Sequence, residues 1–551
     1  RGIEMMDLAG ADHSRANWVR GTCQYGVLPA NGLMYVPPNS CGCYMESLLH
    51  GFYALAAKQP AAEDPARKVA DTDRLEKGPA YGQIGNRKPE IGNGGDWPSF
   101  RHDALRSGVA GTALPTQLKP AWQADLGGNL TQPVVADGKV LVADTDAGAV
   151  LALDAATGRT LWRHLAGGRV DSPPTVHEGL VLFGSADGRV TCLRLADGAL
   201  AWRFLAAPAD LRAVAREQVE SLWPVHGSVL VLNGLAYCSA GRSTWLDGGI
   251  DLYALEPATG KIVRKTRFES PHPKFAEGKE QASDKKYIQR IDQNTTDYKT
   301  FLQSDKSDSF SMAGGANSDV LVSDGTNVFL HQVTFSPQLV KQDEMAPHLF
   351  STSNLLDGVE NHRSHWVLGT GDFSRISVAY SWIVNRPGRK GTAIAVPTGV
   401  VMVFDKDTVW GAQRQGDANG KYRLFRQPNT PFAENEKGLP DFRSPPKEKK
   451  AGGDIRDYAW QHDLPVRPRA MLKAGDHLYM GVMPVEVPTN DPHAAYEGRL
   501  GGKIWVVSAK DGSKVAEIDL PRPVVWDGMA AAGGRLYLAT TDGKVVCMTD
   551  R

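Results

Sequence analysis

One stretch of the sequence occurs twice in succession, and this internal repeat constrains the fold more than any other feature. Residues 131–164 align with residues 171–204 without a gap, so that equivalent residues lie 40 positions apart. The matched pairs are residues that shape a backbone or fill a core: Pro133 with Pro173, Gly148 with Gly188, Gly158 with Gly198, and Trp162 with Trp202. A fixed period of this length is typical of proteins built from repeated structural units.

Each copy contains four short apolar runs, which is the pattern of a small antiparallel sheet. In the first copy the runs cover residues 134–135, 140–142, 150–153 and 160–162. Gly138, Gly148 and Gly158 lie between them, and glycine supplies the positive φ that a tight turn needs. Four antiparallel strands in every 40 residues predict an all-β fold, a β-propeller of four-stranded antiparallel blades.

Trp162 and Trp202 end the last strand of each copy. One sheet cannot bury both of its faces alone, so a large aromatic residue at this position is expected to pack between neighbouring blades. We therefore predict a structural docking role for both tryptophans.

The segment LALDAATGRTLWRH, residues 151–164, resembles the repeat of the pyrroloquinoline-quinone-type propellers. Blades of that family end in the motif Ala-x-Asp-x-x-Thr-Gly-x-x-x-Trp. The family includes quinoprotein alcohol dehydrogenases. It also includes non-catalytic scaffolds, such as the lipoprotein component of the bacterial outer-membrane assembly machine. The resemblance implies the fold and leaves the function open between these classes.

The N-terminal part carries a second resemblance. Residues 1–58 are expected to form a further blade that contains the cysteine cluster, or the last blade of a propeller that lies upstream. The segment NWVRGTCQYGVLPANGLMYVPPNSCGCYMESLLHGFYALA, residues 17–56, is similar to part of large propeller proteins of planctomycetes and related bacteria. Since that part lies mid-chain in those proteins, the resemblance implies that this chain is the C-terminal portion of a longer one.

The rest of the chain divides into a linker and a series of blades. Residues 59–96 are rich in Pro, Gly and charge, and we expect a linker or a long surface loop there. Residues 97–551 are expected to hold the propeller blades. Two polar stretches, at about 269–310 and about 412–458, are expected to be insertions that lie outside the sheets.

The number of blades depends on the N-terminal segment. We expect residues 366–410 to contribute one blade, and counting residues 1–58 as another gives eight, which we favour over seven. The last blade, residues 524–548, has no fourth strand after it, so a strand from elsewhere in the chain is expected to cover its open edge. Residues 2–8 and residues 121–126 both have a suitable length.

Charge and composition argue against several functions. The 62 Lys and Arg residues balance the 62 Asp and Glu residues, so no overall field favours nucleic acid. No apolar run reaches the roughly 20 residues of a membrane span. The sequence begins without Met or a signal peptide, so we expect the targeting segment to be absent or upstream. We expect a periplasmic or otherwise extracytoplasmic protein.

The six cysteines divide into a cluster and three single residues. The single ones occur in strand-like runs and are expected to be small buried hydrophobic residues: Cys192, Cys238 and Cys547. Cys23, Cys41 and Cys43 are candidates for a disulfide. The pairing of Cys23 with Cys41 or with Cys43 is not decided by the spacing, and a metal site is the less favoured alternative.

Two groups of polar and aromatic residues are candidates for ligand binding. The first is expected at the mouth of the channel, where it begins strands or lies in turns: Trp223, His226, Arg242, Trp245 and Asp247. Such side chains can stack on a sugar ring and hydrogen-bond its hydroxyls, or they can simply satisfy a long blade.

The second group comprises His362, His365 and Trp366. Two histidines three residues apart invite a metal-site hypothesis. This segment lacks the carboxylate of known zinc motifs and an obvious third ligand, so a polar loop that enters a strand is the favoured alternative.

A quinone cofactor is the sharpest chemical hypothesis that the family resemblance implies. A pyrroloquinoline quinone site needs a cation such as Ca²⁺ held by carboxylate and amide oxygens, together with a base and an aromatic floor. The catalytic dehydrogenases also place two adjacent cysteines against the quinone. This chain has no Cys-Cys pair, Cys41-Gly42-Cys43 being the nearest, and no C-x-x-C-H haem motif.

We therefore predict an extracytoplasmic propeller that acts as a scaffold for a protein or glycan partner, with no catalytic residue or metal ligand assigned. The first alternative is an alcohol or sugar dehydrogenase that depends on pyrroloquinoline quinone and Ca²⁺. The second is a polysaccharide-acting enzyme that uses the charged loops.

Overall fold

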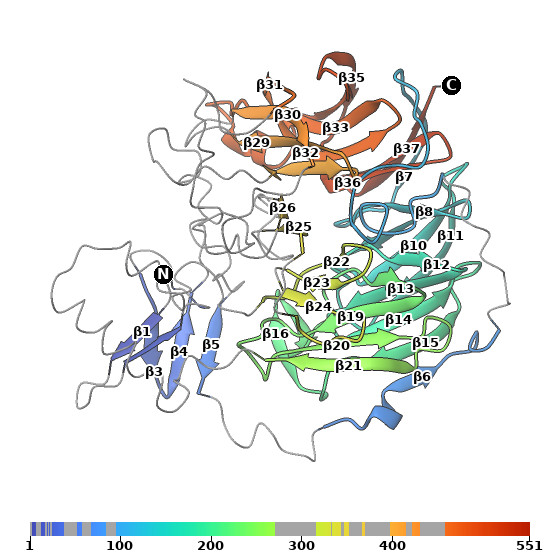
Figure 1. The fold of residues 1–551 in the computed structure, drawn as a ribbon. Coiled ribbons are helices and arrows are strands. Elements are labelled where there is room, and N and C mark those ends of the chain that lie inside the picture. Colours follow the sequence, from blue (N-terminus) through green and yellow to red (C-terminus); the bar gives the residue numbers. More distant parts are fainter. Residues whose placement is uncertain are drawn as a thin grey trace, which may run out of the picture.

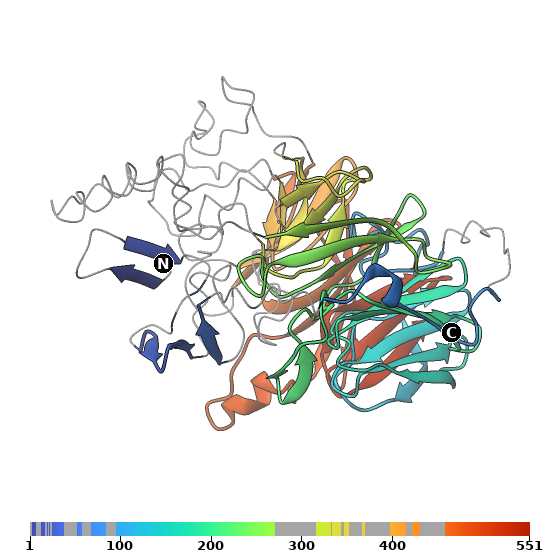
Figure 2. The same ribbon diagram turned by 90° about the horizontal axis from the view of Figure 1, so that it is seen from below.

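The computed structural model of the chain is almost entirely β-structure, with its sheets arranged around a common centre (Figures 1 and 2). It describes residues 3–6, 13–16, 19, 21, 25–37, 52–57, 68–83, 95–269, 316–331, 333–342, 346–351, 366–369, 397–414, 421–429 and 458–550. Helical structure in these residues is limited to the 3-10 turn η4 (Asp71–Asp73) and the short helix α4 (Pro492–Tyr496). The prediction of an all-β propeller with antiparallel blades is confirmed.

Each sheet follows the chain as an antiparallel meander. The first three are β8 (Val134–Ala136), β9 (Lys139–Asp144), β10 (Ala149–Asp154) and β11 (Thr160–Leu165); β12 (Thr175–His177), β13 (Leu180–Ser185), β14 (Arg189–Arg194) and β15 (Leu200–Leu205); and β18 (Leu230–Leu232), β19 (Leu235–Ala240), β20 (Ile250–Leu255) and β21 (Ile262–Phe268). Two three-stranded sheets follow: β22 (Leu321–Ser323), β23 (Val328–Leu330) and β24 (Val333–Phe335); and β25 (His348–Ser351), β26 (Trp366–Gly369) and β27 (Thr398–Gly399).

The C-terminal sheets continue the same pattern. They are β28 (Val401–Phe404), β29 (Thr408–Arg414), β30 (Tyr422–Pro428) and β31 (Trp460–Leu464); β32 (Val466–Ala474), β33 (His477–Pro484), β34 (Gly502–Ser508) and β35 (Lys514–Leu520); and β36 (Val524–Ala532), β37 (Arg535–Thr540) and β38 (Lys544–Thr549) with β7 (Lys119–Asp125). First strands of successive sheets touch, from β8 through β12, β18 and β22 to β25 and from β28 through β32 and β36 back to β8, while β27 contacts β29. The sheets therefore form a closed ring.

Strand β7 closes the ring by pairing with β38 at the opposite end of the chain. Its register places Trp122 opposite Cys547 and Ala124 opposite Val545. Of the two strands that the sequence offered for this role, the one at residues 121–126 is therefore confirmed. The other is wrong, because β1 (Ile3–Met6) pairs instead with β2 (His13–Ala16).

Two of the sequence boundaries need correction. Residues 366–410 do not make one blade, because Trp366 lies in β26 and Trp410 lies in β29 of the next sheet. Strand β30 lies inside the stretch that we expected to be an insertion at about 412–458. Its Tyr422, Leu424 and Phe425 are buried, and this apolar side fixes the segment in the sheet despite its two arginines. The stretch expected at 269–310 lies outside the described residues apart from Glu269.

Three N-terminal strands form a small sheet of their own, β3 (Leu28–Ala30), β4 (Leu33–Val36) and β5 (Tyr53–Ala56). This sheet lies beside the ring in Figure 1. Two sheets of the ring have three strands in the described residues, so the number of blades stays a prediction, as does the role of residues 1–58.

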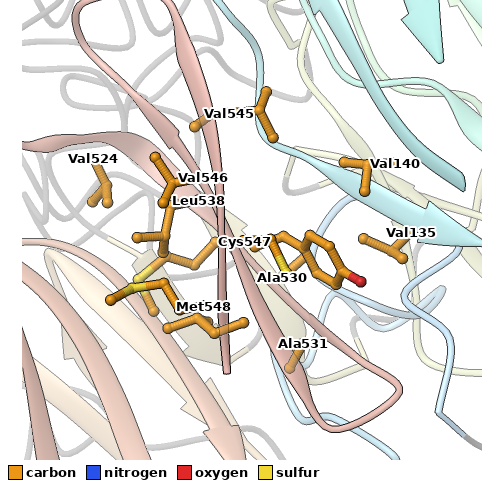
Figure 3. Packing of buried hydrophobic residues seen from close by; sticks show 14 of the residues in the cluster. Val135, Val140, Val524, Ala530, Ala531, Leu538, Val545, Val546, Cys547 and Met548 are labelled. Carbon is orange, nitrogen blue, oxygen red and sulfur yellow. The ribbon is translucent and has the colours of Figure 1, made fainter. Parts of the chain in front are cut away.

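The hydrophobic core is divided into layers that lie between neighbouring sheets. One layer joins the closing sheet to the sheets on either side of it, and Figure 3 shows Val135 and Val140 across from Ala530 and Cys547. The single cysteines behave as predicted, since Cys192, Cys238 and Cys547 are buried and free. The helices of the described residues include none with the length and hydrophobicity that a membrane span requires.

Tryptophans on the outer strands wedge neighbouring sheets together. The ring of Trp202 packs on Gly260 of the next sheet, where a Cβ atom would lie only 2.7 Å from the indole. Gly260 has a φ of +68°, so both its conformation and its lack of a side chain are required. The indole nitrogen of Trp202 donates to the carbonyl of Pro257 at 2.9 Å.

The same wedge recurs around the ring. Trp122 packs on Gly158 and donates to Ala155 (3.1 Å), and Trp162 packs on Gly198 and donates to Leu195 (3.0 Å). Trp410, on the second strand β29, also donates to a carbonyl of the next sheet, that of Ala509 (2.8 Å). Each carbonyl lies just before the Gly-containing turn of the receiving sheet. The repeat motif therefore encodes both halves of the contact, the tryptophan and the turn that receives it.

Residues 95–110, which we call the crossing segment, run across the ring and bind several first strands through backbone hydrogen bonds. The bonds join Trp97 to Val135, Pro98 to Val176, Ala104 to Ser323, Ser107 to Phe404, and Gly108 to Lys473. They therefore reach strands β8, β12, β22, β28 and β32. Since these contacts lie mostly near the ends of those strands, the crossing segment spans the end of the ring where the first strands finish.

The expected linker at residues 59–96 contains an ordered part that docks on the ring. Strand β6 (Leu75–Lys77) pairs with the outer strand β15 and makes that sheet five-stranded. The buried guanidinium of Arg74 donates to the carbonyls of Leu205 and Ala207, both at 2.8 Å. This part of the linker is therefore a structural element.

We expect Trp202→Ala to lower the free energy of unfolding by about 3–5 kcal/mol, because it removes a fully buried aromatic wedge and leaves a cavity. Trp202→Phe keeps an aromatic ring and loses one hydrogen bond, so its loss should be smaller. Urea unfolding followed by circular dichroism measures both. An unchanged midpoint for Trp202→Ala would contradict the wedge.

Candidate functional site

The loops that lead into β12 and β18 meet at the other end of the ring, which we call the mouth. Three hydroxyl groups tie the two loops together. Ser172 donates to the carbonyl of His226 (2.8 Å), Ser228 to that of Pro173 (2.7 Å), and Thr175 to that of Val229 (2.6 Å). These bonds fix the positions of the charged side chains around them.

A buried ionic network lies at the mouth. Nε and Nη2 of Arg169 donate to one oxygen of Asp171 at 2.9 and 2.7 Å, and Nη1 of Arg169 lies 3.2 Å from Glu220. The second oxygen of Asp171 lies 2.6 Å from Nδ1 of His226. A carboxylate can only accept, so Nδ1 of His226 carries the proton of this bond. All four side chains are at most 4% exposed.

The network keeps Asp171 ionised. Burial by itself raises the pKa of this carboxyl, but His226 and Arg169 outweigh burial and hold the pKa at about 2. The charges at the mouth therefore neutralise one another within the protein. A buried ion pair of this kind fixes geometry more than it adds stability, since desolvation offsets much of the attraction.

A rim of partly exposed side chains surrounds the network. Arg242 links the two levels, because its Nη2 lies 3.3 Å from Glu220 and 3.4 Å from the carbonyl of Ser221. Trp223 is buried, and its indole donates to the backbone carbonyl of Asp247 at 2.9 Å. The Asp247 residue itself is exposed.

The N-terminal sheet packs against this rim. Val19 and Val36 are buried in a small apolar cluster to which Trp245 and Leu246 contribute from the loop between β19 and β20. Burial raises the pKa of Tyr53 on β5, while the charges of Arg242 and Arg216 act to lower it. The Tyr53 hydroxyl therefore lies within electrostatic reach of the mouth.

The structure brings together the first predicted group and separates the second. His226 is part of the network, and Trp223, Arg242 and Asp247 lie on its rim, while Trp245 packs in the apolar cluster next to that rim. Trp366 lies elsewhere, buried in β26 with the guanidinium carbon of Arg101 5.0 Å from its ring centroid. Five further candidates lie outside the described residues: His362, His365, Cys23, Cys41 and Cys43.

Arg169, Asp171 and Glu220 are central residues that the sequence reasoning missed. A signal for two of them was present in the repeat. Arg169 and Asp171 align with Asn129 and Thr131 of the first copy, so the two copies differ in charge at this place. A departure of one repeat unit from its neighbour toward charged residues marks a position that packing alone does not require.

A second buried ion pair lies where the crossing segment meets the closing sheet. Arg101 and Asp527 lie 2.8 Å apart, and both side chains are at most 3% exposed. Arg101 also donates to the carbonyls of Arg106 and Met402. The guanidinium of Arg101 thus anchors the crossing segment to strands β28 and β36.

The described residues do not fit a calcium–quinone site. Ca²⁺ takes six to eight oxygen ligands, whereas the buried carboxylates of Asp171, Glu220 and Asp527 are each directed at an arginine. Nowhere in the described ranges do three His, Cys, Asp or Glu side chains gather as a metal site would require.

Comparisons with known proteins support the type of propeller repeat that the sequence indicates. The family model described as outer membrane protein assembly factor BamB matches residues 115–233. The dehydrogenase subunit of the quinone alcohol dehydrogenase of Komagataeibacter europaeus is 31% identical over 171 residues, and that of Gluconacetobacter polyoxogenes is 32% identical over 171 residues. Each match covers 28% of this chain and only 22% of the relative. The chain is a propeller with repeats of the pyrroloquinoline-quinone-like type, while the planctomycete resemblance stays a prediction.

Solved structures give more distant matches. BamB from Moraxella catarrhalis is 10% identical with a TM-score of 0.39, and the match covers 79% of this chain and 100% of that one. The quinohemoprotein alcohol dehydrogenase from Comamonas testosteroni is 16% identical with a TM-score of 0.43, covering 82% of this chain and 80% of that one.

We expect Asp171→Asn to lower the free energy of unfolding at neutral pH by about 3–5 kcal/mol, because it leaves the buried charge of Arg169 without its main partner. Asp247→Asn, on the exposed rim, is the matched control and should change stability by less than about 0.5 kcal/mol. Urea unfolding of the wild type, Asp171→Asn and Asp247→Asn at one temperature measures the three stabilities. Equal midpoints would show that the network contributes nothing.

The same carboxylate predicts a pH dependence. Because its pKa is lower in the folded chain than in the unfolded one, Asp171 stabilises the fold above the unfolded value of 3.8 and loses this effect as pH falls toward about 2. We expect its contribution of about 2 kcal/mol, estimated from the pKa shift, to vanish between about pH 5 and pH 2. The difference in stability between wild type and Asp171→Asn should shrink over that range. A constant difference would contradict the assignment.

Proposed function

We propose that this chain is an extracytoplasmic binding scaffold whose mouth contacts a protein or glycan partner. The observation that carries the proposal is the division of the mouth into a closed floor and an open rim. In the floor, the buried side chains of Arg169, Asp171 and His226 pair with one another. The rim holds Arg242 and Asp247, together with Trp245, which is partly buried against the N-terminal sheet.

The rim suits recognition better than chemistry. An indole face and nearby polar groups are the features that stack on a sugar ring or on an extended chain and hydrogen-bond it. No described side chain of the mouth combines exposure with a neighbouring base in the way that a nucleophile requires. The extracytoplasmic location is supported by the description of the matching family as an outer membrane assembly factor.

A quinone-dependent alcohol or sugar dehydrogenase is the second candidate, and one observation favours it. Both curated relatives are dehydrogenase subunits, and they are 31% and 32% identical to this chain over 171 residues. The match spans less than a quarter of those relatives, so their activity does not carry over directly. The donor set at the mouth argues for the scaffold.

Two assays on the purified chain separate the candidates. We expect titration calorimetry with a panel of soluble neutral and acidic polysaccharides to detect binding that Trp245→Ala weakens about tenfold, a loss of about 1.4 kcal/mol, because it removes the indole on which a sugar ring would stack. Leu161→Ser, on the distant strand β11, should bind as the wild type does. Dye-linked oxidation of ethanol or glucose with added pyrroloquinoline quinone and Ca²⁺ should give no turnover. Turnover in that assay would favour the dehydrogenase.

A further inference from the structure

The chain itself shows how an outer edge of this propeller binds an extended segment. Strand β6 adds to β15 in antiparallel register, with Leu75 opposite Phe204 and Lys77 opposite Trp202. The N–H of Leu205 donates to the carbonyl of Arg74, and the N–H of Gly78 donates to the carbonyl of Ala201, both at 2.8 Å. The outward backbone groups of β15 are thereby satisfied.

Two side chains of β15 select the segment that it binds. Arg203 holds Glu76 in a forked contact, with Nη2 at 2.7 Å and Nε at 3.1 Å from its carboxylate oxygens. Leu75 lies on the opposite face of the sheet, where it meets Gly260 of the next sheet beside the ring of Trp202. The edge therefore recognises a strand with a negative residue beside an aliphatic one, in this case Glu76 and Leu75.

Strand β11 is the repeat copy of β15, and its outer edge has no such cover. Arg163 is equivalent to Arg203, Trp162 to Trp202 and Leu165 to Leu205, at the repeat spacing of 40. No described strand pairs with the outer side of β11. Leu165 is 60% exposed, and Arg163 has no carboxylate partner among the described residues. The same recognition elements are thus present and accessible.

We propose that the outer edge of β11 binds an extended segment of a partner protein by antiparallel strand addition, with an acidic residue on Arg163 and an aliphatic residue beside Trp162. The outward N–H of Leu165 and the outward carbonyl of Leu161 take the places that Leu205 and Ala201 have on β15. Strand addition gains affinity from the backbone and selectivity from alternate side chains. The proposal deepens the scaffold role but uses a surface separate from the mouth.

A synthetic peptide with the sequence of residues 69–81, VADTDRLEKGPAY, is the probe, because it carries the segment that β15 already accepts. We expect its fluorescein-labelled form to show saturable anisotropy with the full chain below about 1 mM. Leu165→Pro should weaken binding about fivefold, because it removes the outward N–H that would donate to the peptide. The fold should tolerate this proline, since the missing N–H lies on the open side of an edge strand. Leu165→Ala keeps that N–H and should lose less.

Charge reversal tests the side-chain half of the proposal. Arg163→Glu should weaken the peptide about fivefold or more, and a peptide with Lys in place of its Glu should bind that variant better than the original peptide does. Arg163→Lys is the matched control and should stay within about twofold of the wild type. Thermal melts confirm that all variants, whose changes lie on the surface, remain folded.

Several outcomes would overturn the proposal. The peptide could fail to bind, or bind equally to wild type, Leu165→Pro and Arg163→Glu. Loss of binding only in Arg203→Glu would place the peptide on β15 instead. A wild-type dimer that Leu165→Pro converts to a monomer would make a second copy of this chain the occupant. Trp245→Ala should bind the peptide normally, so a failure at the mouth and a failure at β11 remain distinguishable.

Discussion

An isolated sheet of four short strands leaves apolar side chains exposed on at least one face. In the ring, each sheet covers these side chains by packing against the sheets on either side of it. The wedge between Trp202 and Gly260 shows how the sequence achieves it. An aromatic ring of one sheet needs a turn without a side chain in the next sheet, and the indole N–H then finds a carbonyl of that turn. Because the sheets bury their second faces against one another through such wedges and apolar layers, they depend on their neighbours for stability.

The two ends of the ring are treated differently. Backbone hydrogen bonds from the crossing segment, with its Arg101–Asp527 ion pair, close one end, and the buried network of Arg169, Asp171 and His226 organises the other. Ion pairs hold loops in one arrangement while adding little net stability, because the desolvation of each charge offsets their attraction. The mouth thus has a rigid, buried floor beneath partly exposed side chains. Such preorganised contacts reduce the entropy that binding costs and would suit the proposed scaffold.

Much of the fold could be predicted from the sequence, because short-range rules determine it. The 40-residue period, the Gly turns and the tryptophans predict the blades, and the missing fourth strand predicts a closing strand such as β7. The predicted boundaries of insertions and linker were wrong where charged residues masked the pattern of a strand. Two arginines in β30 made a buried strand resemble an insertion, and charge in residues 59–96 concealed β6.

The site was harder to predict than the fold. Trp223, His226 and Arg242 could be found because they follow or precede strands of one blade, and such residues meet at one end of a propeller. Their partners Asp171 and Glu220 come from a different blade and from a hairpin, β16 (Arg212–Ala215) and β17 (Gln218–Ser221). Which charged residue pairs with which across blades depends on three-dimensional packing that no local pattern encodes.

The pairing of β7 with β38 also bears on how such a chain is made. A ribosome releases β7 long before β38, so the first outer strand waits unpaired while nearly the whole ring is synthesised. Contacts between such distant parts of a sequence are slow to form, and an open edge can capture other chains in the meantime. The exposed polar and charged side chains of β7, Lys119, Gln123 and Asp125, discourage such capture until β38 is made and the ring closes.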